Sequence, residues 1–403
     1  MGVKKRFIEM VKSGYPEFDP QNDSVEIEFE GGGDSFSSFH YIGLYPNRDK
    51  VEGFNLDNHW DLLFEILDSA GVGYNWNDAG TTGNIKYNEE LSVIQGDFML
   101  NSTKETIYCG LRKNKRKVFK RNKKEYTRLS NHIGLLPIVM ISPADSNLIT
   151  GGSEERRKFI NGVIVQYDKN YLEDLIKYNR LISQRNKLLK DLAVSGNYQD
   201  DTLSVYDEQI VPVGERIYEK RVSFAEKLVP IFQKYYDFIS LGKEKVELIY
   251  QSQLAEGDFS NHLEQSKEKD RILQFTTTGV HKDDLILNLQ GISIKRNGSQ
   301  GQQKTYLVAL KLAKFDFIKE INNTGPILLL DDVFDKFDES RVKQIIKLVS
   351  DDNFGQIFIS HTSEERMKAV LRDISTDHKL FFIQDGVINE LKKNEKKQHP
   401  KNK

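Results

Sequence analysis

The sequence predicts an α/β protein with a mixed sheet and flanking helices, a helical arm, and a small αβ unit at the amino-terminal end. Three observations support this prediction. Strand-like and helix-like patterns alternate from about residue 245 onward, two long helical patterns occupy residues 151–244, and residues 1–90 are acidic, aromatic and glycine-rich, unlike the rest. The predicted units are 1–90 (a small αβ unit of unknown role), 91–150 (a β-meander with a basic hairpin), 151–244 (the arm), 245–390 (the second part of the sheet) and 391–403 (a disordered basic tail).

The composition excludes several classes of protein. A length of 403 residues with 38% apolar content is enough to bury a sizeable core. The 58 basic and 60 acidic residues leave a formal net charge of −2, so contact with nucleic acid requires local clustering of charge. The single cysteine, Cys109, excludes an intramolecular disulfide and a thiolate metal site. Neither an apolar run of roughly 18 residues nor a signal-peptide core is present, so we expect a soluble cytoplasmic protein with no membrane partner.

Residues 91–150 contain a strong cluster of positive charge. Strand-like patterns lead into a basic stretch and return through Tyr126, which predicts a meander with a basic hairpin. Residues 112–128 hold ten Lys or Arg and one Glu, a local charge of +9 (10 − 1). We predict that these cations, interleaved with Phe119 and Tyr126, bind DNA by neutralising phosphates; a solvated surface hairpin is the alternative. The cations predicted to contact DNA are Arg112, Lys113, Lys115, Arg116, Lys117, Lys120, Arg121, Lys123 and Lys124.

Two long helical patterns follow. The first begins at Ser153, with a capping hydroxyl and acids in the first turn, and keeps helical spacing of apolar residues as far as Leu189. The second runs from Leu203 to about Ile239, and we expect a kink or a restart at Pro212. Two long helices separated by a short polar break predict a helical hairpin or arm.

The strongest single feature is an apolar run that ends in two carboxylates. Residues 327–330 are long enough for a buried parallel strand, and Asp331 and Asp332 follow at its carboxyl end. Open α/β sheets place ligands at this edge, and a strand-end Asp commonly holds Mg²⁺ on a nucleotide. We predict that Asp331 holds the metal ion and that Asp332 orients or deprotonates the attacking water. A buried strand followed by an ordinary acidic turn is the alternative.

A glycine-containing turn opens a helix about 30 residues before these carboxylates. Its residues are Ser299, Gln300, Gly301 and Gln302, and an apolar helical pattern follows them. Free backbone N–H groups, a hydroxyl and the positive end of a helix dipole suit a phosphate, whereas a plain capped helix is the alternative. The turn and the carboxylate pair together indicate a nucleotide site more specifically than either feature does alone.

These features resemble the RecF family of bacterial DNA-repair proteins, which belongs to the ABC-type ATPases together with the SMC heads. The resemblance runs from about Ile94 to Ile383. Residues 279–284 resemble the family's Gly-Pro-His-Arg-Asp-Asp, with Val280 in place of Pro and Lys282 in place of Arg. The other segments that carry the resemblance are Ile141–Asp145, Gly151–Phe159, Tyr178–Arg180 and Gln184–Lys190.

The resemblance implies an ABC-ATPase-like head plus a helical arm. It makes residues 299–302 the ABC signature, Asp331 and Asp332 the Walker B pair, and residues 335–338, with Asp338, the D-loop beside the nucleotide. It also places His361, which follows a strand, where ABC ATPases carry the histidine that senses the γ-phosphate. The implied cofactors are ATP and Mg²⁺. The implied partners are DNA at single-strand/double-strand junctions, a second subunit in an ATP-dependent homodimer or mixed dimer, and the recombination mediator proteins of the RecF pathway.

One part of the family pattern is missing from the sequence. RecF-like proteins begin with a P-loop, Gly-x-x-x-x-Gly-Lys-Ser/Thr, whose N–H groups and lysine hold the β- and γ-phosphates. Here the only Gly-Lys pair, Gly242–Lys243, is followed by Glu244. We therefore expect that residues 1–90 replace the P-loop segment and that ATP binding in cis is weak. Two other functions stay open: a non-enzymatic DNA-binding adaptor, and a nuclease-associated or defence-type ABC protein with residues 1–90 as its effector.

Overall fold

The computed structural model describes residues 90–100, 102–112, 117–195, 200–322, 325–334, 337–349, 354–372, 378–384 and 387–390. The predicted amino-terminal unit, except for Glu90, and the predicted tail at 391–403 lie outside the described residues. The division of the chain into domains therefore stays a prediction. Across the described residues, no helix is both long and apolar enough to cross a membrane.

A four-stranded antiparallel sheet comes first in the described chain. Its strands are β1 (Leu91–Leu100), β2 (Thr103–Arg112), β3 (Val118–Arg121) and β4 (Lys124–Glu125), and their order in the sheet is the order of the sequence. Side chains alternate between its two faces, so Ile107, Cys109 and Leu111 of β2 point to one side and pack with Phe119. This small core leaves the other face of the hairpin for polar side chains.

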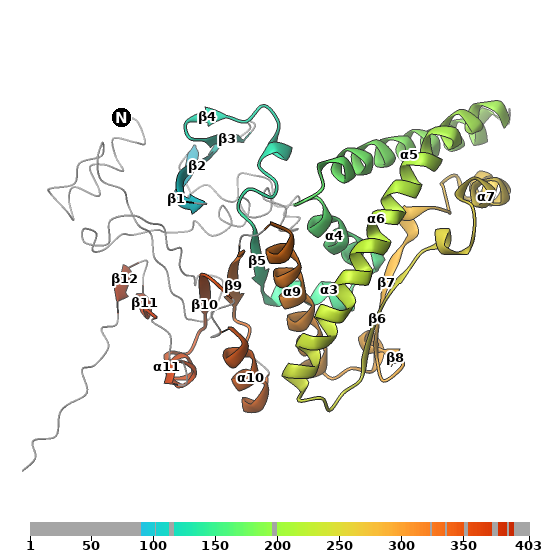
Figure 1. The fold of residues 1–403 in the computed structure, drawn as a ribbon. Coiled ribbons are helices and arrows are strands. Elements are labelled where there is room, and N and C mark those ends of the chain that lie inside the picture. Colours follow the sequence, from blue (N-terminus) through green and yellow to red (C-terminus); the bar gives the residue numbers. More distant parts are fainter. Residues whose placement is uncertain are drawn as a thin grey trace, which may run out of the picture.

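A three-stranded parallel sheet forms the centre of the molecule (Figure 1). Its strands are β5 (Ile138–Ile141), β9 (Ile327–Asp331) and β10 (Ile357–Ser360), with β9 in the middle. The register pairs Ile141 with Leu330 and Ser360 with Asp331. Because all three strands are parallel, the residues that follow them meet at one edge of the sheet.

The arm consists of α4 (Ser153–Ile164), α5 (Lys169–Ser195) and α6 (Asp200–Ser240). The first predicted helix is divided in two, because the Asp168 carboxylate accepts the Tyr171 N–H at 2.9 Å and caps a new helix. The predicted capping role of Ser153 is wrong: Gly152 is the N-cap of α4 and no side chain caps it. A restart at Pro212 is wrong as well, because Pro212 and Pro230 both lie inside the continuous helix α6.

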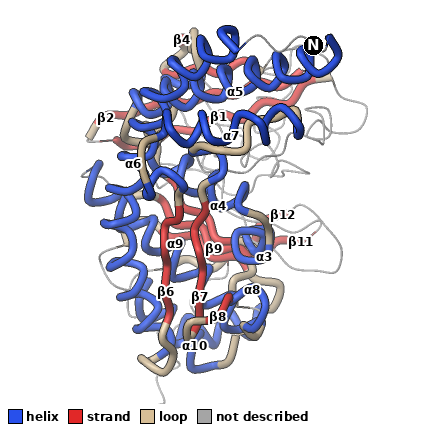
Figure 2. The backbone as a smooth tube through the Cα atoms, turned by 90° about the vertical axis from the view of Figure 1, so that its right-hand side faces the viewer, coloured by secondary structure: helices blue, strands red, loops and turns tan. Residues whose placement is uncertain are grey.

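The remaining elements complete the packing around these units. An antiparallel sheet of β6, β7 and β8 lies beside the arm, and its strands β6 and β7 run side by side in Figure 2. The bounds of these and the other elements are α3 (Asn147–Thr150), β6 (Val246–Gln251), α7 (Phe259–Leu273), β7 (Asp284–Leu289), β8 (Ile292–Ser293), α8 (Ile294–Asn297), α9 (Gln300–Asn322), α10 (Glu339–Val349), α11 (Glu364–Arg372), β11 (Phe381–Gln384) and β12 (Val387–Glu390).

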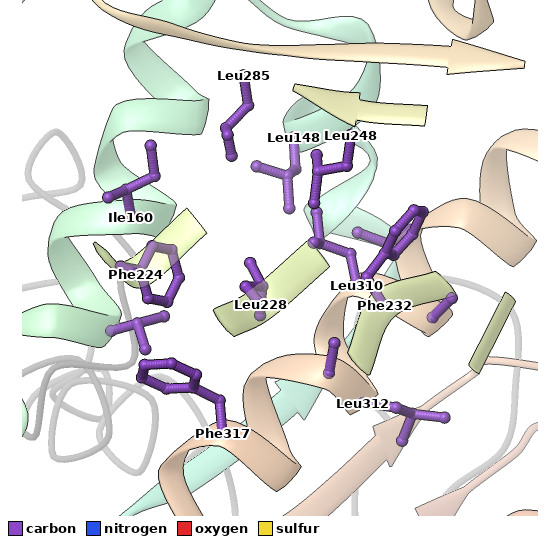
Figure 3. Close-up of a cluster of buried hydrophobic side chains, with 14 of the residues drawn as sticks. Leu148, Ile160, Phe224, Leu228, Phe232, Leu248, Leu285, Leu310, Leu312 and Phe317 are labelled. Carbon is purple, nitrogen blue, oxygen red and sulfur yellow. The ribbon is translucent and has the colours of Figure 1, made fainter. Parts of the chain in front are cut away.

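Helix α9 runs through the main hydrophobic core. Its residues from Thr305 to Phe315 are all buried, so it is covered on every side by other elements. In the close-up of Figure 3, Phe224, Leu228 and Phe232 of α6 lie near Leu310 and Phe317 of α9. The phenyl rings of Phe224 and Phe317 meet edge to face at 5.0 Å. Core packing thus fixes α9 between the arm and the parallel sheet.

Buried charges join the arm to the segment 279–284, which precedes and enters β7. The Arg221 guanidinium donates to the Val280 carbonyl and to the Asp283 carboxylate, both at 2.6 Å, and all of these groups are buried. Gly279 has a φ of +129°, and an added Cβ there would come within 2.4 Å of the Tyr178 hydroxyl. A positive φ and this close approach both require glycine. The motif therefore acts as a structural junction between helices and sheet.

Two histidines are held neutral by burial. Burial lowers the pKa of His132 to about 4, and it lowers the pKa of His281 to about 4 in the same way. His281 Nε2 lies 3.0 Å from the Thr276 carbonyl, so that nitrogen carries the proton, and Nδ1 accepts from the Tyr178 hydroxyl at 2.9 Å. The imidazole of His132 is packed against Phe119 at 4.8 Å between ring centres.

These pKa values predict a loss of stability in mild acid. A histidine with a folded-state pKa of about 4 binds fewer protons than in the unfolded chain, so stability falls as pH drops from 6.5 toward 4. The free energy of unfolding should fall by about 2 kcal/mol per histidine between pH 7 and pH 5. Urea denaturation at both pH values measures this. His132→Gln and His281→Gln should each remove about half of the fall; a double variant with the wild-type pH dependence would contradict the assignment.

Candidate functional site

Several polar residues meet at the carboxyl edge of the parallel sheet. Asp331 is the last residue of β9 and Asp332 follows it, while Ser360 ends β10 and His361 follows that strand. The register that pairs Ser360 with Asp331 places these four residues side by side. Asp145 belongs to the same edge because it follows β5, and it forms an ion pair with Lys311 of α9. The structure thus brings together Asp331, Asp332 and His361, whose roles stay predictions.

Ser360 holds the two carboxylate residues in place, and the sequence reasoning missed it. Its hydroxyl donates to Asp331 Oδ1 at 2.6 Å, and its carbonyl and hydroxyl oxygens each lie 3.3 Å from the Asp332 N–H. Asp332 has a φ of +45°, a left-handed conformation that is uncommon for residues other than glycine. Lys304 of α9 donates to the Asp332 carbonyl at 3.2 Å and helps to hold this conformation. In the sequence, the only signal for a role of Ser360 is its position at the end of a strand.

His361 contacts the second carboxylate. Its Nδ1 lies 3.1 Å from Asp332 Oδ1, and the imidazole side chain is 1% exposed. Its Nε2 is buried without a hydrogen-bond partner within the described part of the chain. Asp332 is more accessible, with 30% of its side chain exposed. One nitrogen of the ring therefore contacts the Asp332 carboxylate, while the other is enclosed by the protein.

The carboxylate pair is electrostatically suited to a cation. Burial raises the pKa of Asp331, and the negative charges of Asp332 and Asp145 raise it further, while the Ser360 hydrogen bond and Lys304 act in the opposite direction. A cation at this edge would relieve the repulsion. Among the described residues, no three His, Cys, Asp or Glu side chains gather in a way that could hold a metal ion by themselves. Other oxygens would have to complete the coordination of any such ion.

The predicted signature turn forms a capping box at the start of α9. The Gln302 N–H donates to Ser299 Oγ at 3.2 Å, and Gln302 Oε1 accepts the Ser299 N–H at 2.9 Å. The N–H groups of Gln300 and Gly301 have no hydrogen-bond acceptor among the described residues. Hydrogen bonds within the turn therefore occupy some of its backbone N–H groups. Two adjacent N–H groups, those of Gln300 and Gly301, remain at the positive end of a long helix.

Two further residues contact this turn and were missed by the sequence reasoning. Arg341 of α10 donates to the Gly301 carbonyl at 3.1 Å, and Glu244 accepts from the Gln302 side-chain amide at 3.0 Å. Asp338, predicted to lie beside the nucleotide, accepts the Arg341 N–H at 2.9 Å and the Ser340 hydroxyl at 2.6 Å. These bonds lower its pKa and make it a cap of α10. Of the predicted D-loop, residues 335 and 336 lie outside the described residues.

The basic hairpin contains cations in different environments. Arg121 forms two hydrogen bonds with Glu105, at 2.7 and 2.5 Å, and this guanidinium holds the pKa of Glu105 below its usual range. Arg112 lies 3.5 Å from Glu90. Lys120, Lys123 and Lys124 have no ion-pair partner among the described residues. The other predicted cations are Lys117, which is half-buried, and Lys113, Lys115 and Arg116, which lie outside the described residues.

Strand alternation explains this division of the hairpin. Phe119 and Arg121 share the inner face of β3, where Phe119 is 3% exposed and Arg121 meets Glu105 of β2. Lys120 lies on the other face, with its ammonium 5.3 Å from the centre of the Tyr108 ring. The prediction that Phe119 is interleaved with the cations at a DNA surface is therefore wrong, because this ring belongs to the core. Tyr108 is the aromatic residue on the cationic face.

The paired carboxylates at a parallel sheet edge, together with the turn at the start of α9, define the head of an ABC-type ATPase. No protein-family model matches the chain. The DNA replication and repair protein RecF of Bacteroides thetaiotaomicron is 51% identical to it over 309 residues, which are 76% of this chain and 83% of that protein. The protein of the same name from Flavobacterium johnsoniae is 47% identical over 300 residues, or 74% and 84% of the two chains.

Solved structures agree with the sequence relatives. The structure of the recombination mediator protein RecF-ATP in the RecFOR pathway is similar with a TM-score of 0.69 and 30% identity, and the match covers 82% of this chain and 87% of that one. The chain therefore belongs to the family of the DNA replication and repair protein RecF.

Removal of the Ser360 hydroxyl should destabilise the protein. In Ser360→Ala the half-buried Asp331 carboxylate loses its 2.6 Å donor, and we expect the free energy of unfolding to fall by about 1–3 kcal/mol. Urea denaturation at pH 7 measures this. Ser340→Ala is the matched control, because it removes an equally short bond to the more exposed Asp338 and should cost less than about 1 kcal/mol. Equal losses in the two variants would contradict the assigned role of Ser360.

Proposed function

We propose that this chain is a RecF-type DNA-binding protein of the cytoplasm that acts in replication and recombinational repair at single-strand/double-strand junctions. Its dimerisation would be controlled by ATP, and its partners would be the recombination mediator proteins of the RecF pathway. The observation that carries the proposal is the position of Asp331 and Asp332 at the sheet edge in a chain that is 51% identical to a RecF protein. The structure of RecF-ATP supports ATP as the ligand.

The residues at the sheet edge fit a magnesium nucleotide. Asp331 would hold the ion through the carboxylate oxygen that Ser360 does not occupy, with water and phosphate oxygens as further ligands. Bound Mg²⁺ would neutralise charge that develops on the transferred phosphoryl group. Asp332 would orient or deprotonate the attacking water, and His361 would hold that carboxylate through Nδ1 and meet the γ-phosphate through Nε2. Ser299, Gln300, Gly301 and Gln302 would serve a nucleotide held by the partner subunit.

The missing P-loop limits what this chain can do alone. Each charge-assisted hydrogen bond to a phosphate contributes roughly 1.5–3 kcal/mol, so the loss of several weakens ATP binding by orders of magnitude. A homodimer would contain two sites that both lack the phosphate cradle. A mixed dimer with a RecF relative that carries the P-loop would retain one complete site, built from the relative's P-loop and this chain's signature turn.

The purified full chain should therefore hydrolyse ATP much more slowly than a RecF relative with a P-loop. The physical reason is weak nucleotide binding, and steady-state phosphate release measures the rate. Any residual turnover should not respond to Asp332→Asn, because it would not arise at this site. Turnover at the level of the relative that Asp332→Asn abolishes would show that the chain holds ATP by other means.

DNA binding is supported by the cationic face of the hairpin. Lys120, Lys123 and Lys124 have no carboxylate partner among the described residues, whereas Arg121 is engaged by Glu105. Free cations of this kind neutralise phosphates and release counterions, without reading the base sequence. We therefore assign the contact with the DNA backbone to these lysines and a positioning role to Arg121.

The triple substitution of Lys120, Lys123 and Lys124 by Gln should weaken DNA binding and flatten its dependence on salt. Three lost phosphate contacts reduce the slope of log K against log salt by about 2–3. Fluorescence anisotropy with a labelled junction at several salt concentrations measures the slope. Substitution of three exposed lysines elsewhere, Lys177, Lys227 and Lys243, is the control with the same change in net charge. An equal effect of both triple variants would remove the hairpin from the interface.

A second candidate function is that of a non-enzymatic DNA-binding adaptor, in which the ABC-type head only dimerises. The missing P-loop is the observation that favours it. A measurement of ATP binding to the full chain, alone and mixed with a P-loop-bearing relative, separates the two. ATP binding in the mixture that exceeds the binding by the relative alone supports the mixed-dimer ATPase, and no increase over the relative alone supports the adaptor.

A further inference from the structure

The carboxylate of Glu244 accepts hydrogen bonds from side chains of three helices, α6, α9 and α10. It accepts from the Gln302 amide at 3.0 Å, from Arg341 Nη2 at 2.9 Å and from the Tyr236 hydroxyl of α6 at 2.6 Å. Only 12% of its side chain is exposed. Burial acts to raise the pKa of Glu244, but the hydrogen bonds from Tyr236, Gln302 and Arg341 outweigh it and lower the pKa. The group is therefore a charged acceptor with its lone pairs occupied by fixed donors.

Arg341 reaches the same turn from the opposite side. Its Nη1 donates to the Gly301 carbonyl at 3.1 Å and to the Thr305 hydroxyl at 2.5 Å, while its Nη2 donates to Glu244. Its Nε lies 3.4 Å from Asp338, the cap of its own helix. The planar guanidinium thus spans the signature turn, the predicted D-loop and Glu244, which an ammonium group could not do with its single nitrogen.

We propose that Glu244 and Arg341 are positioning residues for the signature turn: they fix Gly301 and Gln302 so that the free N–H groups of Gln300 and Gly301 point at the phosphates of a nucleotide held by a partner subunit. This inference rests on the proposed function only for the identity of that ligand. Neither residue contacts the nucleotide. They act by holding a carbonyl and a side-chain amide that would otherwise be free to turn with the end of the helix.

The energetic argument follows from the way the turn is built. Its own capping box restrains Ser299 and Gln302, but Gly301 has no side chain to restrain its peptide groups. Anion recognition by backbone N–H groups requires an orientation held within about 0.5 Å and 10–20°. The bonds from Arg341 to the Gly301 carbonyl and from Gln302 to Glu244 supply that restraint from two elements far away in the sequence.

Hydrogen exchange of the full chain without nucleotide tests the restraint directly. In Arg341→Gln and Glu244→Gln, the amides of residues 302–305 should exchange about tenfold faster than in the wild type, which corresponds to about 1.4 kcal/mol of lost local stability. Arg216→Gln is the control: it removes a guanidinium that binds Asp174 at 2.8 and 2.6 Å, away from the signature turn. Unchanged exchange at residues 302–305 in both test variants overturns the proposal.

A second measurement separates positioning from a purely structural role. ATP-dependent association of the full chain with a P-loop-bearing RecF relative, followed by sedimentation, should weaken about tenfold in Arg341→Gln and partly recover in Arg341→Lys. The far-ultraviolet circular dichroism spectrum and any association without ATP should stay near the wild-type values, because the variants remain folded even though the lost ion pair lowers their melting temperature. If the variants exchange faster but still associate in the presence of ATP as strongly as the wild type does, the positioning role is overturned. A wild-type chain that shows no ATP-dependent association contradicts the proposed function instead, and the exchange result still decides the restraint.

Discussion

Burial of helix α9 is the constraint on which the rest of the structure depends. The helix is covered by α6 on one side and by the parallel sheet on the other, so its apolar residues cannot be exposed without opening the core. Two of its four lysines are buried as well: Lys311 pairs with Asp145, and burial lowers the pKa of Lys314 to about 7, with the charge of Lys311 adding to the effect. A helix held this firmly presents its first turn in a fixed position. The predicted signature residues occupy that turn, so core packing sets where the turn lies, while contacts from Glu244 and Arg341 hold its polar groups.

The parallel register has the same role for the carboxylates. Parallel strands end at one edge, and the pairing of Ser360 with Asp331 places a hydroxyl beside a half-buried carboxylate. The left-handed backbone of Asp332 is then supported from two sides, by Ser360 and by Lys304. Strained backbone conformations that several partners hold in place are common at functional sites, where the orientation of a side chain matters more than the local cost in stability. The chemistry of the edge therefore follows from the order and direction of three strands.

The sequence predicted the strand before Asp331, the helix after Ser299 and the basic hairpin because each has a strong local signal: an apolar run, a cap with a periodic helix, and a run of cations. It could not predict the roles of Ser360, Glu244 or Arg341, because the contacts that reveal them join residues 28 to 97 positions apart. The errors have local causes as well. Asp168 caps a new helix inside an apparently continuous pattern, and strand alternation turns Phe119 inward while Lys120 faces outward.

In the dimer that we propose, the same helix would serve two nucleotide sites. The first turn of α9 would face a nucleotide of the partner, whereas Lys304, one turn later, contacts the carbonyl of Asp332 at the chain's own sheet edge. A displacement of the signature turn would therefore move Lys304 and loosen the support of Asp332. Because residues 305–315 of α9 are closely packed in the core, we expect the two contacts to move together. If one subunit has no P-loop, as we propose, that subunit loses a phosphate contact but keeps the connection between the turn and Asp332, so its first turn of α9 would still serve a partner that carries the P-loop.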